Sequence, residues 1–234
     1  MAKNKKQGSI DMNDTLNKSE ATFLKNRKYL TWIVVAIIVI VAGIVAYHNF
    51  IAVPNENKAS TELGRGQEYF DNEMFDKALN GDGAGYNGFV AIADNYGSTD
   101  AGNLANLYAG LCYANLNKWS DALKYLKKYS PKNDQMVSPA AIGALGDAYA
   151  HNGELDKAIS SFKKAAEKAD KHAVDHRNNS LSPTYLIKAG EILESQGKKD
   201  DALKIYQDIK KKYVNAAIVQ SHEIDKYIER ASTK

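Results

Sequence analysis

The sequence has little of three features that would restrict its function. It contains one cysteine, Cys112, so no disulfide can form within the chain. This leaves the compartment open, because an oxidising space does not require disulfides. Cys112 lies in an apolar helical pattern, which predicts an inert core residue. There are only four prolines, and the composition is otherwise usual for a folded protein.

The third scarce feature is basic charge in the folded part. The net charge of +3 is concentrated in residues 1–30, which hold seven basic and three acidic side chains, leaving 24 basic and 25 acidic residues beyond them. Nucleic-acid binding requires a basic face on the folded domain. The composition therefore argues against a nucleic-acid partner.

Charged residues are absent from residues 29–55, and residues 33–46 are almost purely aliphatic. A helix over residues 30–53 would be about 36 Å long, enough to cross a hydrocarbon core about 30 Å thick. Trp32 and Tyr47 stand near its ends, where amphipathic rings favour the interface. The alternative, a cleaved signal peptide, would have a charged leader far longer than usual, and no small-residue cleavage site follows Ala46. We therefore expect an uncleaved transmembrane helix after a basic arm, residues 1–29.

The basic arm also predicts the orientation. Positive charge precedes the span, while only Lys58 follows it closely. The positive-inside rule places the N-terminus in the cytoplasm and residues from about 54 onward across the membrane. The sequence therefore predicts a single-pass protein whose C-terminal part lies across the membrane from its basic arm.

The rest of the chain repeats itself. Three segments share a glycine, an alanine twelve residues later and a large residue four residues after that, with a tyrosine three after the glycine in two of them. A weaker fourth copy begins at Gly66, and residues 80–88 interrupt its second helix. The shared positions include Gly110, Tyr113, Ala122, Gly146, Tyr149, Ala158, Phe162, Gly190, Ala202 and Tyr206. Small residues at fixed spacing predict helix pairs that cross closely.

This pattern resembles the tetratricopeptide repeat (TPR). The resemblance implies a superhelix of helix-turn-helix repeats. Together with the expected span, it predicts an all-α protein in which a transmembrane helix precedes the superhelix. We expect a TPR domain over residues 54–234, with repeats at about 59–99 (degenerate, with the insertion), 103–134, 139–172 and 183–213. A capping helix over 216–230 would cover the last apolar face.

In such a superhelix the first helix of each pair lines a binding groove. Counting from the repeat glycine, the groove candidates are Leu104, Leu107, Leu111, Asn115, Asp147, His151, Ile187 and Glu191. The lysine and asparagine with which some TPR proteins grip a terminal carboxylate are missing at the corresponding positions. The groove is apolar at one end and acidic at the other, which suits an apolar or basic extended segment. An alternative is that some of these leucines pack on neighbouring helices.

Two apparent motifs do not carry chemistry. Residues 83–88 match G-x-G-x-x-G, but a dinucleotide site needs a preceding strand, and the flanking sequence here is helical. His172 and His176 share a helical spacing but lack a third metal donor. We therefore expect no catalytic residue, no metal and no cofactor.

The order of segments suggests a more specific relation. The lead-in Ser19-Glu20-Ala21-Thr22-Phe23-Leu24-Lys25, the single span and the TPR helices resemble the YfgM-type ancillary subunit of the bacterial Sec translocon. That resemblance implies a single-pass protein of the bacterial inner membrane with a periplasmic C-terminal domain. The protein would be an adaptor that binds proteins or peptides, at the translocon or with chaperones of exported proteins. A scaffold for envelope assembly or cell division is the alternative. The insertion at residues 80–88 departs from the resemblance, and the oligomeric state is left open.

Overall fold

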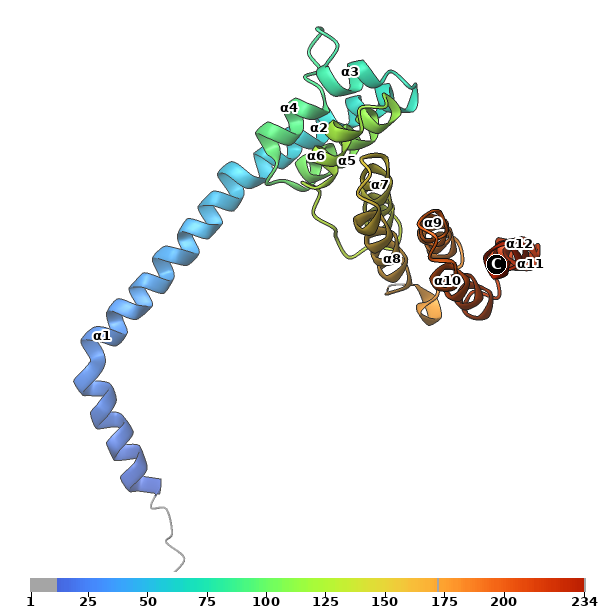
Figure 1. Cartoon of the computed structure of the whole chain (residues 1–234). Coiled ribbons are helices and arrows are strands. Elements are labelled where there is room, and N and C mark those ends of the chain that lie inside the picture. The colour runs from blue at the N-terminus through green and yellow to red at the C-terminus, as the bar shows by residue number, and fades with distance from the viewer. Residues whose placement is uncertain (1–11, 172, 234) are drawn as a thin grey trace, which may run out of the picture. The chain divides into compact units, whose positions relative to one another are not determined.

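The computed structural model describes residues 12–171 and 173–233, with side chains from residue 25 onward, and these residues contain helices and no strand (Figure 1). The chain divides into two units, Met1–Pro54 and Asn55–Lys234.

The first unit is dominated by α1 (Met12–Tyr47), which contains the aliphatic run. The large apolar side chains of this unit, including Trp32 and Phe50, are exposed. By length and composition the chain has one described helix apolar enough to cross a membrane, although a signal sequence would meet the same test.

A π-helical turn, η1 (His48–Ala52), follows α1. The amide of Val53 donates to the carbonyl oxygen of His48, five residues earlier. Pro54 comes next and has no N–H to continue the α-helical ladder. Widened turns of this kind accommodate such an interruption without ending the helix.

The second unit is a series of helix pairs. The first pair is α2 (Val53–Asp71) with α3 (Phe75–Asn80) and α4 (Phe89–Tyr96), and the next is α5 (Asp100–Asn115) with α6 (Trp119–Leu126). Two more pairs follow. They are α7 (Val137–His151) with α8 (Leu155–Lys171), and α9 (Leu181–Ser195) with α10 (Lys199–Lys212). From α4 to α10 each helix contacts the next along the chain, as expected for a repeat protein whose units pack on their neighbours (Figure 1).

The repeat glycines are the points of closest approach between paired helices. A Cβ atom on Gly110 would lie 2.5 Å from Leu126 Cγ, on Gly146 2.8 Å from Phe162 Cε1, and on Gly190 2.4 Å from Tyr206 Cε1. In each pair the obstructing side chain lies sixteen residues after the glycine. The sequence pattern of small and large residues is therefore a steric register between two helices.

The first pair keeps this register despite the insertion. A Cβ atom on Gly66 would lie 2.4 Å from Phe89 Cε1 and 2.3 Å from the Tyr86 hydroxyl. Phe89 opens α4 and lies seven residues beyond the position at which the other repeats place their large side chain. Residues 81–88 thus form a loop inserted into the second helix, and α4 resumes the packing.

The cap consists of two short helices where one was expected. α11 (Ala217–Gln220) and α12 (Glu223–Ser232) are separated at His222, whose φ of 60° lies in the left-handed region. Ile224 and Ala231 of α12 are buried in the core of the last repeat. The described part of the cap therefore closes the apolar end, as its sequence predicts.

Candidate functional site

The first helices of the three clear repeats are α5, α7 and α9. Each packs on the second helix of its own repeat, and in addition α7 contacts both α5 and α9. This arrangement forms a continuous face from residues far apart in sequence. The eight groove candidates all belong to these three helices, so the face is where the sequence would locate a binding site.

On α5 the candidates differ in exposure. Leu107 is buried, 6% exposed, in a core cluster with Leu126 and Ala141. Leu104 and Leu111 are half-buried at the edge of that cluster, and the exposed Asn115 side chain donates to the Leu111 carbonyl oxygen. Leu107 is therefore a core residue in this structure, which leaves Leu104, Leu111 and Asn115 with accessible surface.

A hollow of about 380 Å³ lies between α7 and α9. Its lining includes two candidates, Asp147 and Glu191, together with Phe162 and Lys188. The Lys188 ammonium contacts Asp147 Oδ1 at 2.7 Å and lies 5.4 Å from the centre of the Phe162 ring. Asp147 is thus neutralised, while Glu191 is exposed. The excess charge of this hollow is the single carboxylate of Glu191.

The two other candidates lie elsewhere. Ile187 is buried, 8% exposed, in the core that surrounds Tyr206. His151 is exposed and stacks on Trp119 of α6, with ring centres 3.6 Å apart and planes 2° from parallel. Asn152 supports this stack by donating to the Trp119 carbonyl oxygen, so His151 joins two repeats.

Sequence reasoning missed two polar clusters. In the first, Tyr206 and Arg230 both donate to the carboxylate of Glu194, which ties α9, α10 and α12 together. The hydrogen bonds from Arg230 and from Tyr206 hold the pKa of Glu194 below its ordinary value, against the effect of burial. These contacts join residues far apart in the sequence, and no local sequence pattern predicts them.

The second cluster surrounds Asp170 at the end of α8. Its carboxylate accepts from Ser182 Oγ at 2.6 Å, the Tyr213 hydroxyl at 2.6 Å and the Asn178 amide at 2.8 Å, and pairs with Lys212. Burial raises the pKa of Asp170, but these donors outweigh it and leave the pKa below its ordinary value. A serine before a proline in the first turn of a helix, repeated at Ser138 of α7 and Ser182 of α9, was the available signal.

The remaining motifs have structural explanations. In the glycine-rich loop Tyr86 is buried and donates to the Ala78 carbonyl oxygen, while Asp82 accepts from the amides of Ala84 and Tyr86. The loop is thereby part of the core of the first repeat. Cys112 is also buried, and burial raises the pKa of its thiol to about 12. His172 lies outside the described residues.

Comparisons with known proteins define the class of this helical repeat. Two tetratricopeptide-repeat family models match, one at residues 104–130 and 185–216 and the other at residues 141–174. Two crystal structures of nearly identical TPR-like repeats, from a Podosopora anserina protein described as a kinesin light chain, share 10% identity with this chain. Both have a TM-score of 0.52 and cover 75% of the chain, which covers 93% and 94% of theirs. No curated protein matches the sequence.

The chain therefore contains tetratricopeptide repeats. At 10% identity the likeness to the solved structures establishes the fold alone. Repeats of this class are generally scaffolds for protein interaction and typically have no enzymatic activity.

Proposed function

We propose that this protein is a membrane-anchored adaptor that binds an extended protein segment along the face of α5, α7 and α9. The hollow between α7 and α9 carries the proposal, because it opens on the first helices and contains the exposed carboxylate of Glu191. Apolar surface of Leu104 and Leu111 lies toward the other end of the series. A segment with apolar residues followed by basic ones is complementary to this face.

The anchor and its direction belong to the same proposal. The charge-free run of α1 would hold the protein in a bacterial inner membrane, with the basic arm in the cytoplasm and the repeats in the periplasm. The resemblance to the YfgM-type subunit supports partners at the Sec translocon or among chaperones of exported proteins. An adaptor at that position would bind proteins as they emerge from the membrane.

Site-specific photo-crosslinking in native membranes tests the binding face. A benzophenone amino acid at Asn115 or Glu191 is expected to capture a defined partner, identified by mass spectrometry. The same group at Lys124, which is exposed on the second helix α6, is the control. Envelope-assembly or division proteins captured from both first-helix positions would replace the translocon assignment but keep the adaptor.

Two substitutions separate binding from folding. Leu111→Glu introduces charge on an apolar contact and Glu191→Lys reverses the acidic end, so each is expected to weaken partner affinity about tenfold, or about 1.4 kcal/mol. Gln207→Glu and Glu229→Lys make matching charge changes at exposed positions of α10 and α12. Unchanged capture with Leu111→Glu and Glu191→Lys, at unchanged melting temperature, would move the binding site away from this face.

A further inference from the structure

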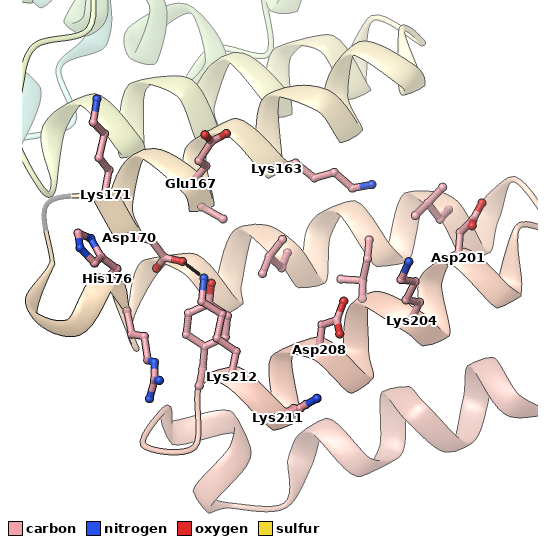
Figure 2. A pocket seen from close by; sticks show the side chains of 16 residues that line it. Lys163, Glu167, Asp170, Lys171, His176, Asp201, Lys204, Asp208, Lys211 and Lys212 are labelled. Carbon is pink, nitrogen blue, oxygen red and sulfur yellow. Dashed lines mark hydrogen bonds and ion pairs between the residues drawn. The ribbon is translucent and has the colours of Figure 1, made fainter.

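A second groove lies between the second helices of the last two repeats. It has a volume of about 1010 Å³ and is lined mainly from α8, α9 and α10, with His176 and Arg177 contributed by the segment between α8 and α9 (Figure 2). None of the eight first-helix candidates lines it. We refer to it as the α8–α10 groove.

The floor of the α8–α10 groove is apolar. Both α8 and α10 pack on α9, so Leu186 and Leu193 of α9 line the bottom of the groove between α8 and α10. Ala166 of α8 and Ile205 of α10 complete the floor. Ala166 and Leu193 are buried, whereas Leu186 and Ile205 are half-buried and offer apolar surface to a ligand.

The rims of the groove are charged. On α8 the charged side chains recur every four residues, at Lys163, Glu167 and Lys171. On α10 acidic and basic side chains alternate in the order Asp201, Lys204, Asp208 and Lys211 (Figure 2). Spacings of three and four residues keep each series on one side of its helix. The rims are therefore continuous rows rather than scattered charges.

Most of these charges have no partner within the described chain. Asp170 and Lys212 pair with each other at one end of the groove (Figure 2). Among the remaining lining residues, five cationic side chains and three carboxylates form no ion pair with any described residue. The cations are Lys163, Lys171, Arg177, Lys204 and Lys211, and the carboxylates are Glu167, Asp201 and Asp208. The chain beyond residue 30 has a net charge of −1, so the groove gathers positive charge that the domain as a whole lacks.

We propose that the α8–α10 groove is a docking site for an acidic amphipathic helix of a partner protein. The apolar face of that helix would cover Leu186 and Ile205, and its acidic flanks would meet Lys163 and Lys204. This site is separate from the first-helix face and gives the adaptor a second partner.

The length of the rims sets the size of the occupant. Lys163 to Lys171 spans about 12 Å of α8, and Asp201 to Lys211 spans about 15 Å of α10, at about 1.5 Å per residue. A helix of two to three turns fills that length. It would carry apolar residues at intervals of three and four, as helices bound in grooves do.

The test uses the full-length chain in nanodiscs of phosphatidylcholine. The probe is a fluorescent helix-forming peptide of about 14 residues, with leucine on one face and glutamate on the other. The control peptide has lysine in place of glutamate. Binding is measured by anisotropy. We expect the acidic peptide to bind, the basic peptide to bind at least tenfold more weakly, and added salt to weaken the acidic complex.

Variants locate the peptide on the protein. Lys163→Glu with Lys204→Glu is expected to weaken binding at least tenfold, and Ile205→Glu to do the same by removing apolar floor. Lys164→Glu with Lys226→Glu makes the same charge change at exposed positions outside the groove and is expected to leave affinity unchanged. Circular dichroism melting of every variant verifies that the fold is retained.

Several results would overturn the proposal. They are equal binding of both peptides, an equal loss in the Lys164 and Lys226 control, and displacement of the peptide by phosphatidylglycerol vesicles, which would assign the cations to lipid. If Glu191→Lys abolished peptide binding while Lys163→Glu with Lys204→Glu left the affinity unchanged, the peptide would bind on the first-helix face instead.

Discussion

Gly146 illustrates how a single residue sets the distance between two helices. Its Cα faces the Phe162 ring so closely that any Cβ atom would lie 2.8 Å from Cε1. Phe162 is only 1% exposed and cannot move aside into solvent. A side chain at this position must therefore separate α7 from α8.

Gly146→Leu is expected to lower the free energy of unfolding by about 1–3 kcal/mol through overpacking. Ala158→Trp should act in the same direction, because Ala158 is fully buried in the adjoining core. Gly64→Ala is the control, since a Cβ atom there meets nothing within 4 Å, and it should be neutral or stabilising. Urea unfolding followed by circular dichroism measures all three. Parent-like stability of both overpacked variants would contradict the helix register.

The polar contacts of Asp170 join three helices. It accepts hydrogen bonds from Ser182 in α9 and from Tyr213 just after α10, while it lies near the end of α8 itself. Its side chain is nearly buried, so an uncharged or misdirected group would leave donors without an acceptor.

Asp170→Asn is expected to cost about 2 kcal/mol at pH 7. The folded pKa is lowered, so this contribution is present above the ordinary pKa of aspartate and is lost as the pH falls through the lower folded value. The stability difference between wild type and variant should therefore shrink below about pH 4. Asp156→Asn, which removes an exposed pair with Lys198, is the control and should change stability little. Melting at pH 7 and pH 3 provides the measurement, and a difference that does not vary with pH would contradict this role.

The turn within each helix pair has one conformation throughout the protein. Seven residues after each repeat glycine, the chain enters the left-handed region, at Glu73, Asn117, Gly153 and Gly197. The next amide then donates to a carbonyl oxygen five residues back, as in Met74 to Tyr69 and Lys118 to Tyr113. This is the helix-ending arrangement that glycine favours. The degenerate first repeat therefore keeps the turn of the others but places glutamate where glycine fits best.

Glu73→Gly is expected to stabilise the protein by about 1 kcal/mol, because glycine adopts positive φ without the steric cost that a side chain incurs. Gly153→Ala should destabilise it by a similar amount for the converse reason. A Cβ atom at Gly153 meets nothing within 4 Å, so this effect isolates backbone strain from packing. Differential scanning calorimetry compares the two. A drop in melting temperature for Glu73→Gly would show that its side chain matters more than its backbone.

On the scale of the whole molecule, the proposed membrane anchor, with its charge-free run at residues 29–55, predicts one topology for the repeat domain. A helix with a hydrophobic run and a basic arm before it inserts with the arm on the cytoplasmic side. The proposed adaptor works only if its repeats and its partners share a compartment.

A reporter active only outside the cytoplasm, fused after Lys234, is therefore expected to be active in bacterial cells. Protease added to spheroplasts should digest residues 60–234. Replacing Lys25, Arg27 and Lys28 with glutamine serves as the control and should reduce reporter activity, because it removes the charge bias next to the span. Protection of the repeats from protease would exclude the proposed location.

The sequence by itself determined the repeat architecture, because small and large residues at fixed spacing impose a local steric register that survives in every pair. It also determined the candidate span, because residues 29–55 carry no charge and form a run long enough to cross a hydrocarbon core as a helix. Both features depend on neighbours along one helix or one hairpin. Both can therefore be predicted without knowledge of contacts between distant residues.

Only the tertiary structure decided which candidate residues are accessible. Leu107 and Leu111 lie one helical turn apart, yet Leu107 is buried and Leu111 is only half-buried, because the core cluster formed with α6 and α7 encloses Leu107 and covers Leu111 in part. The pairing of Asp147 with Lys188 and the groove between α8 and α10 likewise depend on residues about forty positions apart. Burial and ion pairing depend on how the helices pack. The spacing of apolar residues in the sequence predicts which residues share a helix face, but not which side chains of other helices contact that face.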